Sequence, residues 1–145
     1  MRSTFLLAAT LLLALPVHAA EANVLKVSVV HATKTKGKAV TIDPKLKRIG
    51  KSLTKAFSGY QNFKRLSNHE LKLTPKASIK LPGNRTAVFT HKGKKGDEVS
   101  LNLAIPKSKV DVSLRSPPGR VFFQAGLKHD KGILILALYL RPPKK

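Results

Sequence analysis

Of the five histidines in this sequence, the four that follow the N-terminal apolar segment are the first side chains that could hold a metal or transfer a proton: His31, His69, His91 and His129. None of them has the spacing of a His-Glu-x-x-His zinc motif. Two have an acidic neighbour, in His69-Glu70 and His129-Asp130, but adjacent side chains diverge in an extended strand. We therefore predict surface histidines, with no metal and no other cofactor. A site assembled in space from distant histidines stays open.

Nucleophiles and paired acids are the next candidates, and the sequence offers neither in a known pattern. It has no cysteine and no Gly-x-Ser-x-Gly segment, in which a strained turn exposes a nucleophilic serine. Its seven acidic residues are scattered, which disfavours a hydrolase with two carboxylates. Residues 92–96, Lys-Gly-Lys-Lys-Gly, have the charge of a phosphate loop but not the Walker spacing or the Ser/Thr that follows it. The sequence predicts no catalytic residues, so we expect a protein that is not an enzyme; an enzyme whose site follows no known pattern is the third hypothesis, after the two binding functions given below.

Positive charge is the strongest signal in the composition. The chain has 28 Lys and Arg against 7 Asp and Glu, a formal net charge of +21. Any single basic cluster is typical of a solvated surface, but the total exceeds the magnitude of roughly 2–8 that suits a small soluble domain. We predict anion-binding residues in the clusters Lys34, Lys36, Lys38; Lys47, Arg48, Lys51, Lys55; and Lys92, Lys94, Lys95. Lys64-Arg65 is a further basic pair outside this set.

A field of this sign attracts anionic surfaces and polymers. The first hypothesis is a non-catalytic exported protein that binds an anionic envelope component, such as lipopolysaccharide, another acidic glycan or lipid head groups. It could equally act as an adaptor in an envelope assembly by binding an acidic protein. The alternative is an exported nucleic-acid-binding protein, whose charge would neutralise phosphates. Aromatic residues are few, at 6 Phe and 2 Tyr, so stacking platforms for bases are not evident.

The N-terminus indicates export. Arg2 precedes the apolar residues 5–15, which are too short to span a bilayer. Pro16 follows them, and residues 17–19 supply the small residues of a signal-peptide cleavage site. We predict a signal peptide at 1–19, cut after Ala19, which leaves 126 of the 145 residues and, without Arg2, a charge of +20. With no cysteine there is no disulfide and no lipoprotein anchor, and no later apolar run has transmembrane length. The expected location is periplasmic or extracellular, in a bacterium.

The elements that must position the charges begin with one helix over residues 43–59. Asp43 can cap its first turn, Pro44 suits the first helical position, and Gly59 can end it in a left-handed conformation. Its apolar side is expected to contain Leu46, Ile49, Leu53, Ala56 and Phe57. The cations of 47–55 fall on the opposite side, so the spacing predicts one buried face and one basic face.

Alternating apolar residues predict strands over most of the remaining chain. The first is 24–32, and the clearest half-buried one is 99–105. Residues 71–81, interrupted by Pro75, are two short strands or one bulged edge strand. Residues 133–140 are apolar on both faces, which suits a strand covered on two sides, with a buried helix as the competing reading.

The predicted class is α+β: one amphipathic helix after the first strand, packed on a mostly antiparallel sheet of about six to seven strands. Residues 20–140 form a single domain, and 141–145 a basic tail. This layout resembles small uncharacterised exported bacterial proteins, in the segments Asp43-Pro44-Lys45-Leu46, Phe57-Ser58-Gly59-Tyr60 and Gly132-Ile133-Leu134-Ile135-Leu136-Ala137. The resemblance implies a strand, helix and strand-meander arrangement, and it carries no activity.

Overall fold

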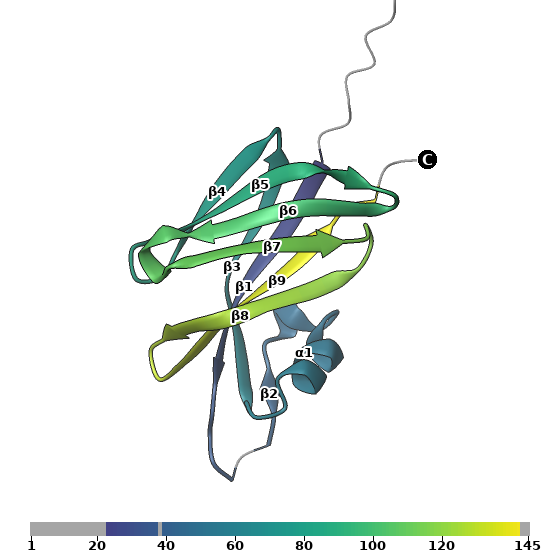
Figure 1. The fold of residues 1–145 in the computed structure, drawn as a ribbon. Coiled ribbons are helices and arrows are strands. Elements are labelled where there is room, and N and C mark those ends of the chain that lie inside the picture. The colour runs from purple at the N-terminus through teal and green to yellow at the C-terminus, as the bar shows by residue number, and fades with distance from the viewer. Residues whose placement is uncertain (1–22, 38, 143–145) are drawn as a thin grey trace, which may run out of the picture.

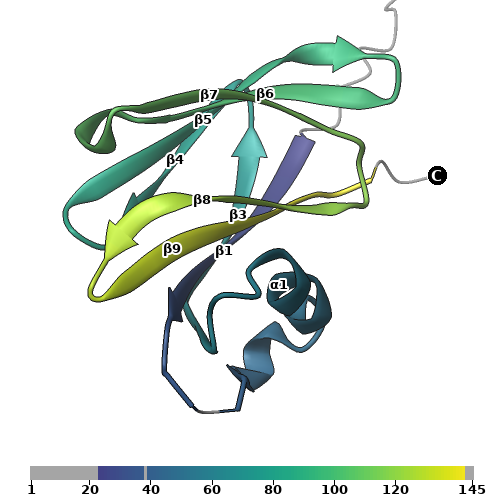
Figure 2. The same cartoon turned by 60° about the horizontal axis from the view of Figure 1, so that its bottom comes forward.

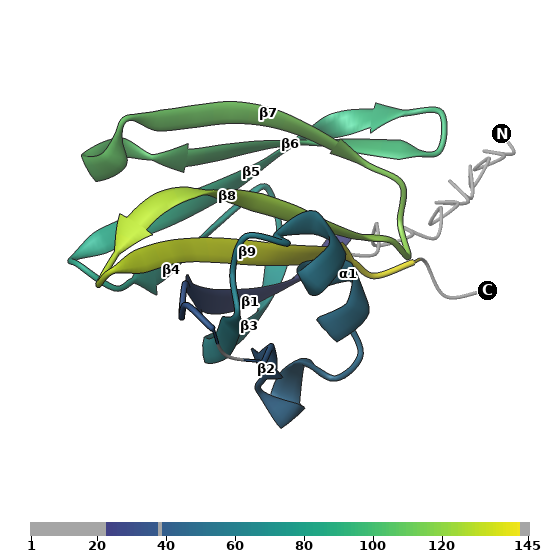
Figure 3. The same ribbon diagram turned by 90° about the horizontal axis from the view of Figure 1, so that it is seen from below.

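The computed structural model describes residues 23–37 and 39–142, which form three layers (Figures 1 and 3). A four-stranded sheet packs on one face of a five-stranded sheet, and a small helical layer covers part of the other face. The predicted signal peptide, Lys38 and the last three residues of the predicted basic tail lie outside the described residues.

The five-stranded sheet has the order β2-β3-β1-β9-β8. Its strands are β1 (Asn23–Thr33), β2 (Thr41–Ile42), β3 (Asn62–Leu73), β8 (Val121–His129) and β9 (Gly132–Leu140). All pairs are antiparallel except the short parallel contact between β2 and β3. The first and last of these strands, β1 and β9, are therefore neighbours in the middle of the sheet.

The four-stranded sheet is a meander of β4 (Lys76–Leu81), β5 (Arg85–Lys95), β6 (Glu98–Ile105) and β7 (Val110–Ser116), in which a short 3-10 helix, η2 (Pro106–Ser108), links the last two strands. The chain passes between the sheets at prolines: Pro75, after a cis peptide bond, and Pro117-Pro118. Proline cannot donate a ladder hydrogen bond, so both passages end a strand. The predicted class is confirmed, but residues 23–37 and 39–142 contain nine strands, which divide into two sheets rather than one.

The main core lies between the two sheets. Leu25, Val27 and Val29 of β1 point into it because alternate residues of a strand share one face. Phe89 of β5 and Leu103 of β6 oppose them and have no exposed surface. The inward faces thus match the period-2 pattern of the sequence.

A second core lies under the helical layer, on the other face of the five-stranded sheet. Val30 and Ala32 of β1 and Ile135 of β9 face this side and are fully buried against Leu46 and Leu53. Strand β9 therefore has buried residues on both faces, which confirms the prediction for 133–140. Figure 2 shows the helical layer against the side formed by β1 and β9.

The helical segment is shorter and more broken than predicted. It consists of a 3-10 helix, η1 (Pro44–Leu46), and an α-helix, α1 (Gly50–Ala56), joined by a turn. Asp43 does cap the first turn, through a 3.0 Å bond from the Lys45 N–H to Oδ1. Gly59 does not cap the end, because α1 stops at Ala56 with Phe57 as its C-cap, at φ −123°.

The interruption follows from how the segment is attached. The second Asp43 oxygen, Oδ2, accepts the N–H of Arg65 in β3 at 3.1 Å, so η1 is held on that strand. Gly50 then lies so close to Ile42 that an added Cβ would be 3.2 Å from its Cδ1. The predicted apolar face is otherwise largely correct, but Ala56 is exposed.

Candidate anion-binding site

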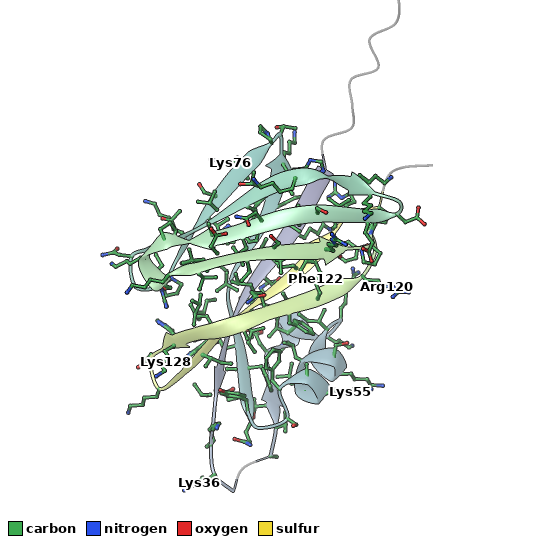
Figure 4. The ribbon with its side chains drawn as sticks, viewed as in Figure 1. Lys36, Lys55, Lys76, Arg120, Phe122 and Lys128 are labelled. Atoms are coloured by element: carbon green, nitrogen blue, oxygen red, sulfur yellow. The ribbon has the colours of Figure 1, made fainter. Side chains whose placement is uncertain are left out.

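The predicted basic residues are not gathered into one surface. Lys47, Arg48, Lys51 and Lys55 are exposed on the helical layer, and Lys34 and Lys36 are exposed in the loop after β1. Figure 4 labels Lys55 and Lys36, one from each cluster. Lys92, Lys94 and Lys95 belong to the β5–β6 hairpin of the other sheet. In Figure 1 this hairpin and the β1–β2 loop lie at opposite ends of the molecule. They are therefore separate clusters.

A groove on the face of the five-stranded sheet brings several cations together. We call it the sheet-face groove; its volume is about 460 Å³ and its lining is Lys26, Ser28, Lys45, Leu46, Arg48, Ile49, Arg65, Asn68, Val121, Ala137 and Tyr139. Four of these eleven residues are cations and none is acidic. The volume lies within the range of about 300–1,000 Å³ typical of small-molecule sites.

The floor of the groove follows from strand alternation. Lys26 and Ser28 point to the same face as Val30 because they are two residues apart in β1. In the register of the sheet, Lys26 lies opposite Tyr139, and Ser28 lies between Asn68 and Ala137. The helical layer covers the face near Val30 and leaves the part near Lys26 open. The groove is the border between the covered part and the open part.

Asp43 fixes two of the cations at this border. Its carboxylate accepts the backbone N–H of Lys45 and of Arg65, which anchors η1 beside β3. These two hydrogen bonds, that from Lys45 first, hold the pKa of Asp43 below its ordinary value of 3.8. The carboxylate is thus ionised at neutral pH, and both of its oxygens accept backbone N–H groups. The side chains of Lys45 and Arg65 line the groove.

The nearest other acid in the register is also engaged. Glu70 lies opposite Lys26 on β3, and its Oε1 pairs with Arg141 at 2.5 Å. The Arg141 N–H also bonds to the Val24 carbonyl at 2.9 Å, so the first residue of the predicted tail is fixed to the sheet. The groove keeps a positive excess with these carboxylates counted.

Neutral polar groups complete the floor. The Ser28 hydroxyl donates to Asn68 Oδ1 at 2.9 Å, which leaves the Asn68 amide N–H groups as donors. Tyr139, half-buried, adds a phenol. Cations and neutral donors can together bind a phosphate, sulfate or carboxylate through charge-assisted hydrogen bonds.

A second hollow, of about 530 Å³, lies at the β8–β9 turn. Lys34, Tyr60, Lys128 and Lys131 line it together with Asp130. The Lys34 ammonium is already 5.3 Å from the centre of the Tyr60 ring, a distance typical of a cation–π contact. Because Asp130 lowers the positive excess and Lys34 already contacts a ring, we regard the sheet-face groove as the better anion site.

Two of the four histidines do meet in space. The rings of His31 and His129 are 5.0 Å apart edge to face, and His31 Nε2 is 3.1 Å from the His129 carbonyl oxygen. Elsewhere His69 Nε2 bonds to the Ser67 hydroxyl at 3.0 Å. Within residues 23–37 and 39–142, no three His, Cys, Asp or Glu side chains come together as metal ligands would.

Sequence reasoning selected only Arg48 among the four groove cations. It left Lys26 and Lys45 unselected and noted Arg65 only as half of a basic pair. A usable signal was present, because Lys26 and Ser28 alternate with the buried residues of β1 and so had to lie on the opposite face. The sequence of β1 alone does not show which other elements lie on the face that carries Lys26 and Ser28.

Comparisons with known proteins add no identification. No protein family, no curated protein and no solved structure matches this chain. In the part of the chain that the structure describes, no helix is long and apolar enough to cross a membrane.

Proposed function

We propose that this protein is a non-catalytic exported protein that binds an anionic component of the cell envelope, and that the sheet-face groove holds the anion. The observation that carries the proposal is the convergence of Lys26, Lys45, Arg48 and Arg65 on one groove with no acidic residue in its lining. These side chains come from three segments of the chain, since only Lys45 and Arg48 are near neighbours in the sequence. Local sequence bias therefore does not explain their meeting.

The total charge supports the same proposal in a different way. The charge of +20 expected after removal of the signal peptide would raise the local concentration of any anion and speed its encounter with the protein, an effect that salt screens. The groove would then supply contacts of defined geometry. A groove-bound anion should therefore keep part of its affinity at high salt, whereas an anion held only by the general field should not.

A charge-matched pair of variants tests the proposal. In the groove variant, Lys26, Lys45 and Arg48, all exposed, become serine. In the control, Lys92, Lys94 and Lys95 of the β5–β6 hairpin become serine, so the net charge changes equally. Binding of lipopolysaccharide, heparin and single-stranded DNA is measured for both variants and the parent at 50 and 200 mM salt.

We expect the groove variant to lose at least about tenfold in affinity for its preferred anion, on the basis of about 1.5–3 kcal/mol for a hydrogen bond to a charged group. The hairpin variant should lose much less. Equal losses in the two variants would show binding by the general field alone and would refute the groove as the site. A preference for DNA, with a salt slope that falls by about 0.7 per lost phosphate contact, would favour the nucleic-acid alternative.

A further inference from the structure

The sheet-face groove is polar on one side and apolar on the other. Across the strand order β3-β1-β9-β8, the first two strands contribute Arg65, Asn68, Lys26 and Ser28, and the last two contribute Tyr139, Ala137 and Val121. Adjacent strands are about 4.8 Å apart, so the lining changes from cationic to mainly apolar over roughly 14 Å. The polar and apolar residues of the floor therefore lie on different pairs of strands.

The helical layer contributes both kinds of side chain: the cations Lys45 and Arg48, and the apolar residues Leu46 and Ile49. Leu46 and Ile49 line the groove from η1 and the turn after it. Ala137 lies on the floor between Tyr139 and Ile135 of the same β9 face, and its small side chain leaves room above it. Beyond it, Phe123 of β8 packs edge to face on Phe57, with ring centres 5.8 Å apart.

The exposure of Val121 at the end of this surface is unusual for the molecule. Among the residues that the structure describes, three large hydrophobic side chains are exposed: Val40 at 53%, Leu66 at 38% and Val121 at 37%. Of these, Val121 lines the groove. A single exposed valine is ordinary on a protein surface; what Val121 adds is an apolar end to a groove that also contains four cations.

We infer that the anion bound here is the phosphate-bearing head of a membrane lipid, together with the first methylenes of its acyl chain. This inference rests on the proposed function and adds the class of ligand. The phosphate lies over β3 and β1, where Lys26, Arg48 and Arg65 can contact it. The acyl chain of the lipid crosses Ala137 and reaches Val121. A soluble acidic sugar or a free phosphate would leave the apolar half of the groove uncovered.

A series of alkyl phosphates separates the two halves of the groove. Butyl, hexyl and octyl phosphate share one head group, and calorimetry below the concentration at which they form micelles gives their affinities. A fully buried methylene is worth about fourfold in affinity, and a groove that covers the chain on one side is worth about half of that free energy, or twofold. Octyl phosphate should therefore bind about 16-fold more tightly than butyl phosphate.

The same substitution at two exposed valines tests where the alkyl chain of the ligand lies. Val121→Ser removes the exposed apolar end of the groove, and Val40→Ser makes the same change at an exposed valine of the β1–β2 loop. We expect the first to reduce the octyl-over-butyl ratio to below about fivefold and the second to leave it unchanged. Melting temperatures of both variants establish that they are folded.

Three results would overturn the inference. Equal affinities for the three phosphates would show that the groove does not bind the alkyl chain. If that binding were still lost in the serine variant of Lys26, Lys45 and Arg48, the proposed anion site would hold without the lipid inference. A chain-length effect that survives Val121→Ser would place the chain elsewhere. Equal binding of octyl glucoside, which has no phosphate, would show that the head group is not recognised. Failure of the proposed function would instead appear as no groove-dependent binding of any anion.

Discussion

The packing of α1 on the five-stranded sheet can be tested at Leu53. This side chain has no exposed surface and lies in the second core with Leu46, Phe63 and Ile135. Leu53→Ala removes three carbon atoms and leaves the backbone and the helix propensity almost unchanged. The substitution therefore measures how tightly the helical layer is packed.

The expected loss follows from two contributions. Transfer of the missing carbon atoms out of a buried site costs about 2–3 kcal/mol, and the cavity left behind brings the total to about 2–5 kcal/mol. Because α1 has seven residues and lies at the surface, it can settle partly into the cavity. We expect a loss near 3 kcal/mol, or about 12 °C in melting temperature for a domain of roughly 120 residues.

Urea unfolding followed by circular dichroism gives the free energy of unfolding of parent and variant. Lys51→Ala is the matched control, since Lys51 is exposed in the same helix and its change should stay within about 0.5 kcal/mol. A loss below about 1 kcal/mol for Leu53→Ala, with an unchanged m-value, would refute the packed second core.

Three further predictions concern other parts of the chain. Ile135→Asp should unfold the protein, because Ile135 has no exposed surface and a buried carboxylate would lack a partner; a parental melting curve would contradict this. Asp43→Asn should lower the melting temperature above pH 3.8. The lowered pKa of Asp43 means that its stabilisation is present above the unfolded value and is lost as the pH falls through the folded one. The gap between parent and Asp43→Asn, measured from pH 6 to pH 2, should therefore shrink in acid, and a constant gap would exclude an electrostatic role. The mature N-terminus should be Ala20, and N-terminal sequencing of exported material that found Met1 would overturn the export prediction.

Much of the local structure could be predicted because it depends on neighbouring residues. The alternation of 99–105 predicts β6, which is buried at every second residue, and the apolar run of 133–140 predicts β9. Asp43 and Pro44 mark the start of the helical segment correctly. The interruption of that segment could not be predicted, because a hydrogen bond from Arg65 to Asp43 and the close approach of Gly50 to Ile42 come from other parts of the fold.

The groove is hard to predict for a related reason. Lys26, Lys45 and Arg65 lie on three elements, and only the register of β1 with β3 and the attachment of η1 bring them together. The division into two sheets is likewise decided by long-range pairing. A pattern within one segment determines which side of a strand is buried, but not which other strand covers it.

The central place of β9 has a consequence for the order in which the protein can be assembled. Leu25 pairs with Leu140, and β9 lies between β1 and β8 and pairs with both. Until residues 132–140 are available, β1 has an unpaired edge and β8 has no partner in its sheet. A chain that emerges from a ribosome or a translocation channel N-terminus first can form the β4–β7 meander early, since its contacts are local. The five-stranded sheet, and the groove on its face, can form only after the last strand has emerged.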